Sequence, residues 1–257
     1  MRTILVYDET FEGFLSVVFY VFEYKLKHVI IQKESIASET FFDATQMVIT
    51  EEKKADRVWK GLLKYIKASE RTKLYKAYLS ELPSIENDLL WYIQNAIASE
   101  KNIAGNFANP TILKISKIVK MVDREKHRMD AFVRFRLTKD DMYMATVSPD
   151  FNVLPLNAAH FKNRYADQRW LIYDLKRTYG IYYDLKKVTT VTLDLTSDVN
   201  TASASSVYFT EHELQYQTLW KNYFKSTNIE SRKNMKLHVQ HVPKRYWKYL
   251  SEKSPFS

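Results

Sequence analysis

RWLIY at residues 169–173 and IYYDL at residues 181–185 are the two runs that decide the fold class of this chain. Both are rich in aromatic and branched residues, and Gly180 lies near the polar turn between them, so they predict an antiparallel pair of strands. Val188–Leu195 follows as a further strand, because apolar residues alternate in its second half. Together these runs predict a small antiparallel sheet.

The residues before this sheet predict two more strands and a helix. Apolar side chains alternate over Ala131–Leu137, and Met142–Val147 is a second strand candidate after a polar turn. Leu156–Tyr165 has the composition of a short helix. Further upstream, apolar residues recur every three to four positions, which predicts helices over 51–68, 71–79, 84–99 and 109–122.

The two ends of the chain complete the predicted order. Thr3–Tyr7 and Thr45–Ile49 are short strand candidates, and Thr10 can cap a helix over 11–25. At the other end we expect a linker over 198–206, a helix over 211–225 and a last short helix that Pro243 opens.

Because helices and strands are segregated along the chain, the predicted class is α+β: a helical block, then a small antiparallel sheet, then a basic helical C-terminal segment. We expect residues 1–128 to form the α/β start and helical block and residues 129–257 the sheet and basic end. The sequence leaves open whether these are two domains or one continuous domain.

Composition excludes several classes of site. The 257 residues include no cysteine, which excludes disulfides, thiolate zinc sites and iron–sulfur ligation. The four glycines are too far apart for a phosphate-binding loop. The longest apolar run, Phe14–Phe22, is too short to span a bilayer. We therefore expect a cytoplasmic protein with no membrane segment, no bound metal and no cofactor.

Positive charge is concentrated in two parts of the chain. The formal net charge is +9, and residues 221–253 carry nine basic side chains against two acidic ones, with aromatic residues between them. Residues 160–187 carry seven basic against three acidic side chains. Such stretches suit phosphate attraction and base stacking, but they are equally typical of solvated faces. The candidate nucleic-acid-binding residues are Arg164, Arg169, Arg177, Lys244, Arg245, Trp247 and Lys248.

Four residues are candidates for acid–base catalysis. His127 and His160 lie in dense polar clusters, and a histidine oriented by a carboxylate can act as a general base near neutral pH. Asp174 and Asp184 follow or end the two deciding strands. If those strands are antiparallel, the two carboxylates lie toward opposite ends, and capping of turns is the simpler interpretation of both.

Several motifs resemble those of a family of bacterial proteins of unknown function. They are spread from near the start of the chain to near its end: Tyr7–Leu15, Glu125–Phe135, Leu154–Leu156 with His160–Phe161, Arg164–Asp174, Gly180 with Tyr182–Asp184, and His241–Leu250. Glu9 departs from the opening motif, where we expect glycine, and this bears on the geometry of a turn. The family is described as DNA metabolism or DNA repair proteins. Its members resemble a domain fused in some bacteria to a uracil-DNA glycosylase-like domain, and they are associated with a radical SAM protein assigned to DNA modification or repair.

Three functions are compatible with these observations. The first is a nucleic-acid-binding accessory protein, and the second is an enzyme that acts on DNA or nucleotides through the His/Asp set. The third is an interaction subunit for the radical SAM protein, a partner that the resemblance implies. Without cysteine, this chain cannot itself hold the iron–sulfur cluster of that chemistry.

Overall fold

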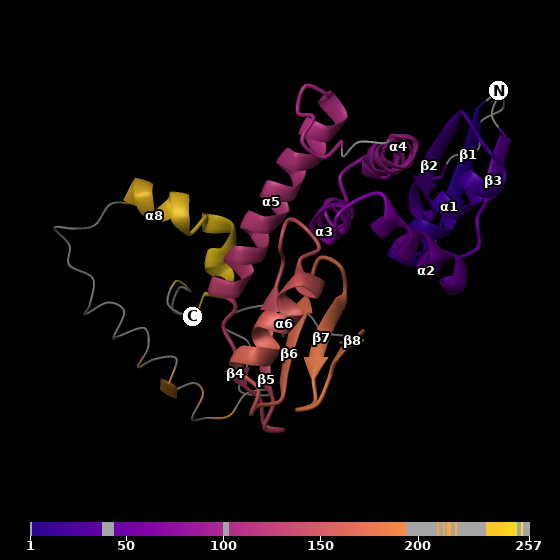
Figure 1. Ribbon diagram of the computed structural model, residues 1–257. Coiled ribbons are helices and arrows are strands. Elements are labelled where there is room, and N and C mark those ends of the chain that lie inside the picture. The colour runs from indigo at the N-terminus through magenta and orange to yellow at the C-terminus, as the bar shows by residue number, and fades with distance from the viewer. Residues whose placement is uncertain are drawn as a thin grey trace. The chain divides into compact units, whose positions relative to one another are not determined.

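The computed structural model describes residues 2–37, 44–99, 103–193 and 235–250, with single residues at 210, 213, 215, 216, 219 and 253. The chain divides into two compact units, Met1–Asp123 and Arg124–Ser257, here called unit 1 and unit 2 (Figure 1). The predicted linker over 198–206 and most of the predicted helix over 211–225 lie outside the described residues.

Unit 1 begins with a three-stranded parallel sheet in the order β2-β1-β3. The central strand β1 (Thr3–Tyr7) is almost completely buried, and its neighbours are β2 (Val29–Lys33) and β3 (Ala44–Met47). Strand β2 was not predicted from the sequence. Helix α1 (Phe11–Glu23) connects β1 to β2, as a parallel pair requires.

The predicted cap of the first helix is confirmed. The Thr10 hydroxyl accepts a hydrogen bond from the backbone N–H of Gly13 at 2.9 Å. Just before it, Glu9 has a φ of 65°, in the left-handed region that favours glycine. This is the position where the family motif leads us to expect glycine, so the departure at Glu9 falls on a turn that needs that conformation.

Helices make up the rest of unit 1. The single helix predicted over 51–68 is divided into α2 (Glu52–Gly61) and the short 3-10 turn η2 (Leu62–Lys64), and α3 (Ala68–Tyr78) follows. The break lets both Leu62 and Ile66 reach the core, where they are 2% and 6% exposed. Helix α4 (Ile85–Ala98) matches the prediction to within one residue at each end.

Helix α5 (Pro110–Phe132) starts in unit 1 and ends in unit 2. It ends ten residues later than predicted, and of the strand expected over Ala131–Leu137 only the last two residues, Arg136 and Leu137, are a strand. Val122, Glu125, Met129 and Val133 are all buried at helical spacing, so the period of 3.6 residues extends through a stretch that also alternates.

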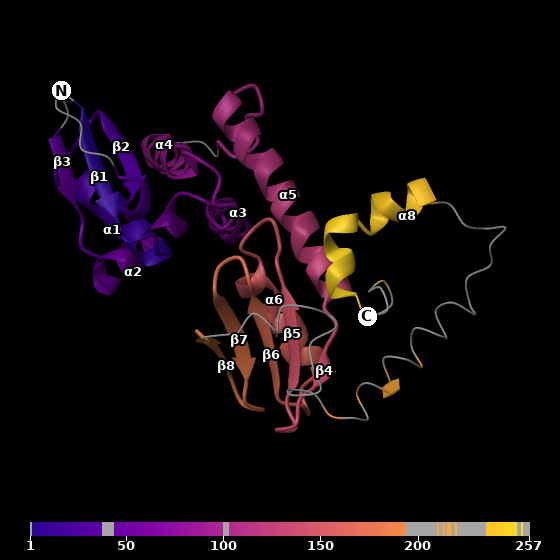
Figure 2. The same ribbon diagram turned by 180° about the vertical axis from the view of Figure 1, so that it is seen from behind.

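Unit 2 contains a five-stranded sheet, with all strands side by side in both views (Figures 1 and 2). Its order follows the chain: β4 (Arg136–Leu137), β5 (Tyr143–Val147), β6 (Trp170–Asp174), β7 (Tyr179–Tyr183) and β8 (Val188–Val191). The sheet is mixed and not purely antiparallel, because β5 and β6 run parallel. Helix α6 (Leu154–Arg164) is the crossover between them.

An aromatic cluster forms the core where α6 meets the sheet. Trp170 on β6 is 0% exposed, and its ring lies 6.1 Å from that of Phe161 and 5.5 Å from that of Tyr183. Phe135 adds an edge-on contact to Phe161 at 5.8 Å. Such pairs stabilise a core beyond the burial of their area.

The C-terminal part of unit 2 is helical where it is described. It consists of α8 (Met235–His241) and the 3-10 helix η5 (Lys244–Tyr249), which follows Pro243 as predicted. Figures 1 and 2 both show this segment beside the C-terminal end of α5. No helix in the described ranges is both long and apolar enough to cross a bilayer.

Candidate nucleic-acid interface

Asp174, a candidate catalytic residue, is fully buried at the end of β6 and is held by its own turn. The Arg177 guanidinium pairs with its carboxylate at 2.8 Å, and the backbone N–H groups of Lys176 and Arg177 donate to the same carboxylate at 2.9 and 3.4 Å. Every one of these contacts stabilises the β6–β7 hairpin. Asp174 therefore acts here as the capping residue of a turn.

Asp184 lies at the other end of the same hairpin. It accepts hydrogen bonds from the backbone N–H groups of Lys187 at 2.7 Å and Lys186 at 2.9 Å, and these bonds lower its pKa. Trp170 pairs with Tyr183, and Asp174 pairs with Tyr179. At ~3.3 Å per residue, the two aspartates are roughly 16 Å apart along the strands. The structure does not bring them together.

The two candidate histidines have no orienting carboxylate among the described residues. His127 is exposed on α5, and His160 is half-buried on α6 with its ring 5.2 Å from that of Phe161. Within the described residues, neither imidazole makes a hydrogen bond or an ion pair with an acidic side chain. A general base that depends on such a carboxylate is therefore not assembled around either ring.

Two of the candidate basic residues are neutralised by buried or nearby acids. Arg177 is only 9% exposed, and besides pairing with Asp174 it donates to the carbonyl oxygens of Pro149 and Asp150. Arg245 pairs with Glu125 at 3.1 Å and with Asp150 at 2.6 Å. Both guanidinium groups serve the internal structure of unit 2.

Glu125 is a key residue of unit 2 that the sequence analysis did not single out. It is 1% exposed on α5, and its two carboxylate oxygens lie 2.5 and 2.6 Å from the Tyr246 hydroxyl. The backbone N–H of Asp150 donates to it at 2.9 Å. Burial and the bond to Glu125 raise the pKa of Tyr246. Together with Arg245, these contacts fasten η5 to α5.

The remaining candidate cations have no carboxylate partner among the described residues. Arg164 lies 5.7 Å over the ring of Tyr165, and Arg169 reaches only backbone carbonyls of the 140–141 turn. Lys244 and Lys248 are exposed on η5. Across the described part of the chain, none of these four side chains forms an ion pair. They are exposed side chains of unit 2 that an anionic ligand can reach.

The four cations form two groups. Arg164 ends α6 and Arg169 directly precedes β6. Lys244 and Lys248 belong to η5, which Arg245 joins to the Asp150 side chain. The Asp150 carbonyl also accepts a hydrogen bond from Arg177, which follows the opposite end of β6. Trp247, the aromatic candidate, lies between Lys244 and Lys248 in the sequence and is half-buried. Its indole N–H donates to the Val242 carbonyl at 2.9 Å. Its polar edge is therefore used internally.

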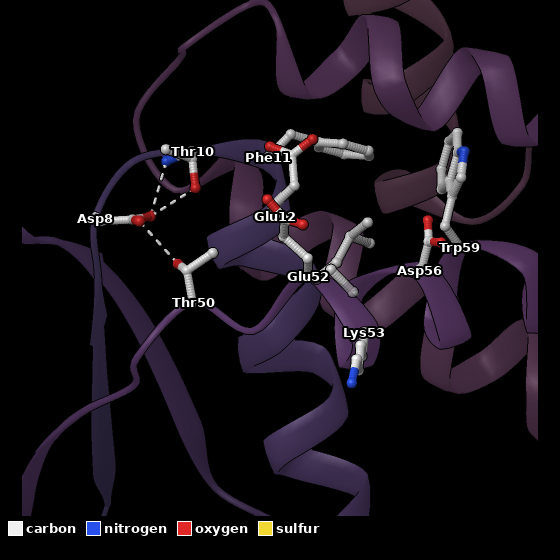
Figure 3. Close-up of a pocket in the computed structure, with 11 residues that line it drawn as sticks. Asp8, Thr10, Phe11, Glu12, Thr50, Glu52, Lys53, Asp56 and Trp59 are labelled. Atoms are coloured by element: carbon white, nitrogen blue, oxygen red, sulfur yellow. Dashed lines mark hydrogen bonds between the residues drawn. The ribbon is translucent and has the colours of Figure 1, made fainter.

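Unit 1 contains a cavity of about 580 Å³ beside β1 (Figure 3). β1 is the central strand of its parallel sheet, with β2 on one side and β3 on the other. Open α/β sheets commonly bind ligands at the end of a strand in this position. The lining of the cavity includes the acidic residues Asp8, Glu12, Glu52 and Asp56 and one lysine, Lys53. The cavity is therefore acidic, in contrast to the exposed cations of unit 2.

Asp8 organises the loops around this cavity. Its carboxylate accepts hydrogen bonds from the hydroxyl groups of Thr10 and Thr50, both at 2.7 Å, and from the backbone N–H of Thr10 at 3.1 Å (Figure 3). Burial alone would raise the pKa of Asp8, but these bonds outweigh it and lower the pKa. Gly13 is needed beside it, because a Cβ there would lie 2.1 Å from the Asp8 carboxylate.

Comparison with known proteins adds a family without a known activity. Residues 83–252 match the model of DUF4130, a domain of unknown function. No curated protein matches the chain. The match covers well over half of the chain, including α4, α5 and all of the sheet of unit 2. The chain therefore belongs to the DUF4130 family.

Proposed function

We propose that this protein binds nucleic acid through unit 2 and works as an accessory subunit in DNA metabolism or repair. One observation carries the proposal: Arg164, Arg169, Lys244 and Lys248 are exposed, and none has a carboxylate partner within the described residues. Cations that are not already neutralised can release counterions from a phosphate backbone, which supplies most of the affinity of such interfaces.

The distribution of charge favours this unit over the cavity of unit 1. A phosphate backbone would meet four carboxylates in that cavity against one lysine. Like charges at that spacing oppose binding. In unit 2, by contrast, Glu125 and Asp174 are buried and already paired, and the more exposed Asp150 pairs with Arg245.

An enzyme that uses the four His/Asp residues receives less support from the geometry. Asp174 and Asp184 lie at opposite ends of a hairpin, and both accept bonds from their own turns. His127 and His160 lack a carboxylate in the described part of unit 2. We therefore place any reaction on a partner and propose the radical SAM protein named by the family resemblance. Co-purification of the two proteins tests this partnership, and absence of a complex would refute it.

The DNA-binding proposal is tested with two double variants. One is Arg164→Ala/Arg169→Ala and the other is Lys244→Ala/Lys248→Ala, each measured by fluorescence anisotropy with a short labelled duplex and a matching single strand. Removal of one phosphate contact changes the salt exponent by ~0.9 on a duplex. We expect each double variant to bind several-fold more weakly at about 0.1 M salt.

The matched control removes the same charge from cations that are already paired. Lys60 pairs with Asp56 at 2.6 Å, and Lys73 pairs with Glu70 at 2.8 Å, both in unit 1. We expect Lys60→Ala/Lys73→Ala to bind nearly as the unmodified protein does. Equal weakening by all three variants would show that only net charge matters and would contradict an interface on unit 2.

A further inference from the structure

Unit 1 has an apolar groove that the proposed function does not use. It has a volume of about 460 Å³ and lies between α1, α2, η2 and α4. It is separate from the acidic cavity, with which it shares no lining residue. Its apolar lining includes Val18, Phe19, Phe22, Val58, Leu62 and Tyr65.

The groove keeps large apolar side chains in contact with water. Phe22 is 41% exposed and Tyr65 is 47% exposed. Clusters of this kind on a soluble unit mark sites where another apolar surface binds.

The charges on the rim of the groove are unequal. Its carboxylate, Glu23, lies 3.8 Å from Lys54, which also pairs with Glu51 at 2.7 Å. Arg57 lines the groove as well, with its guanidinium 5.6 Å over the ring of Phe19. Within the described residues, Arg57 has no carboxylate partner. The rim therefore offers one positive charge that is not neutralised, next to an apolar floor.

We propose that this groove binds a segment of a partner protein that presents apolar side chains flanked by aspartate or glutamate. Apolar side chains would cover Phe22 and Tyr65, and a carboxylate beside them would pair with Arg57 at the edge of a dehydrated surface.

The same features disfavour two other occupants. A second copy of this chain would need a self-complementary surface, whereas the one carboxylate that lines the described groove, Glu23, lies beside Lys54 and would have to leave it to pair with the Arg57 of a second copy. A nucleic acid would need several cations along its backbone, whereas Arg57 is the one unpaired cation that lines the described groove.

Selection from a random peptide library displayed on phage, with the full chain as bait, tests the proposal. We expect enriched peptides to combine leucine, phenylalanine or other large apolar residues with aspartate or glutamate. Synthetic copies should lose at least about tenfold in affinity for Phe22→Ser/Tyr65→Ser, because two apolar contact surfaces are removed. Arg57→Glu should reverse the preference, so that a new selection enriches lysine or arginine.

Two controls make the result specific to the groove. Ile49 is 78% exposed outside the lining, so Ile49→Ser should leave peptide affinity unchanged. Circular dichroism checks that each variant stays folded, as expected for exposed positions. The double variants of unit 2 should also bind the peptides normally, so failure of the DNA proposal would leave this one standing.

Several outcomes would overturn the inference. They are the absence of enriched peptides, enrichment of peptides that ignore the Phe22/Tyr65 change, and an unchanged charge preference with Arg57→Glu. A dimer in sedimentation that Phe22→Ser/Tyr65→Ser dissociates would assign the groove to self-association. Duplex binding that the same variant abolishes would assign it to nucleic acid.

Discussion

Glu125→Gln is the substitution that tests the internal organisation of unit 2 most sharply. The change keeps the size of the side chain but removes the charge that faces Tyr246, Arg245 and the backbone N–H of Asp150. It also brings an amide N–H₂ group into a site that is 1% exposed and surrounded by donors. One donor of the site must then lose its acceptor or face another donor.

The expected cost can be worked from these contacts. A buried hydrogen bond to a charged group contributes about 1.5 to 3 kcal/mol, which applies to the Tyr246 hydroxyl. Arg245 is 42% exposed and keeps Asp150, so its share is discounted to less than about 1 kcal/mol. We therefore expect Glu125→Gln to lower the free energy of unfolding by about 3 kcal/mol.

Urea-induced unfolding followed by circular dichroism measures this loss. The matched control is Asp167→Asn, at an exposed position of unit 2 without an ion pair in the described residues, which we expect to change stability by less than about 0.5 kcal/mol. In a double-mutant cycle with Tyr246→Phe, the two losses should overlap by at least about 1 kcal/mol. A loss for Glu125→Gln no larger than that of the control would refute this account of how η5 is fastened.

Three further predictions concern the loops around β1. Gly13→Ala should lower the free energy of unfolding by about 1 to 3 kcal/mol because the added Cβ would meet the Asp8 carboxylate. Gly61→Ala, where a Cβ would have nothing within 4 Å, should be neutral or stabilise α2. Urea-induced unfolding of both variants measures the difference. Glu9→Gly should be about 1 kcal/mol more stable than Glu9→Ala. Both variants lose the hydrogen bond from the Ser35 N–H, but only alanine keeps the energetic cost of a φ of 65°. Equal stability of the two variants would contradict a left-handed backbone at this position. Asp8→Asn should cost about 1 kcal/mol near pH 7, and because the folded pKa of Asp8 is lowered, the difference from the unmodified protein should shrink below about pH 4 and vanish once the pH is below that lowered pKa; a difference that persists in strong acid would exclude the charge as its cause.

Local signals predicted much of the fold. The α+β class, the cap at Thr10, helix α4 and the short helix after Pro243 are all set by residues next to one another in the chain. Pairing of β6 with β7 was also predictable, because a short polar turn with Gly180 near it leaves an antiparallel hairpin as the simplest arrangement.

What the sequence did not reveal depends on distant contacts or on ambiguous periods. The stretch from Ala131 alternates like a strand, yet burial of Met129 and Val133 on one helical face extends α5 to Phe132. The parallel pairing of β5 with β6 follows from the packing of α6 as a crossover, which no local pattern specifies.

The candidate site shows the same division. Charge counts singled out Arg177 and Arg245, but only the structure shows that Asp174 and Glu125 neutralise them from other positions in the chain. Glu125 belongs to the Glu125–Phe135 motif of the family resemblance. Because its neighbours in the sequence are also charged, nothing in the sequence indicated that its side chain is buried. The interleaved aromatic and basic residues left the role of this segment open, and the structure shows that one of these aromatic residues, Tyr246, is 1% exposed.

The salt dependence of duplex binding tests the central proposal most directly. Unmodified protein and the quadruple variant Arg164→Ala/Arg169→Ala/Lys244→Ala/Lys248→Ala are titrated with the same labelled duplex between about 50 and 200 mM salt. If these four cations contact phosphates, the slope of log K against log salt should become shallower by up to about 4, at ~0.9 per contact. An unmodified protein that does not bind, or a quadruple variant with an unchanged slope, would contradict the account.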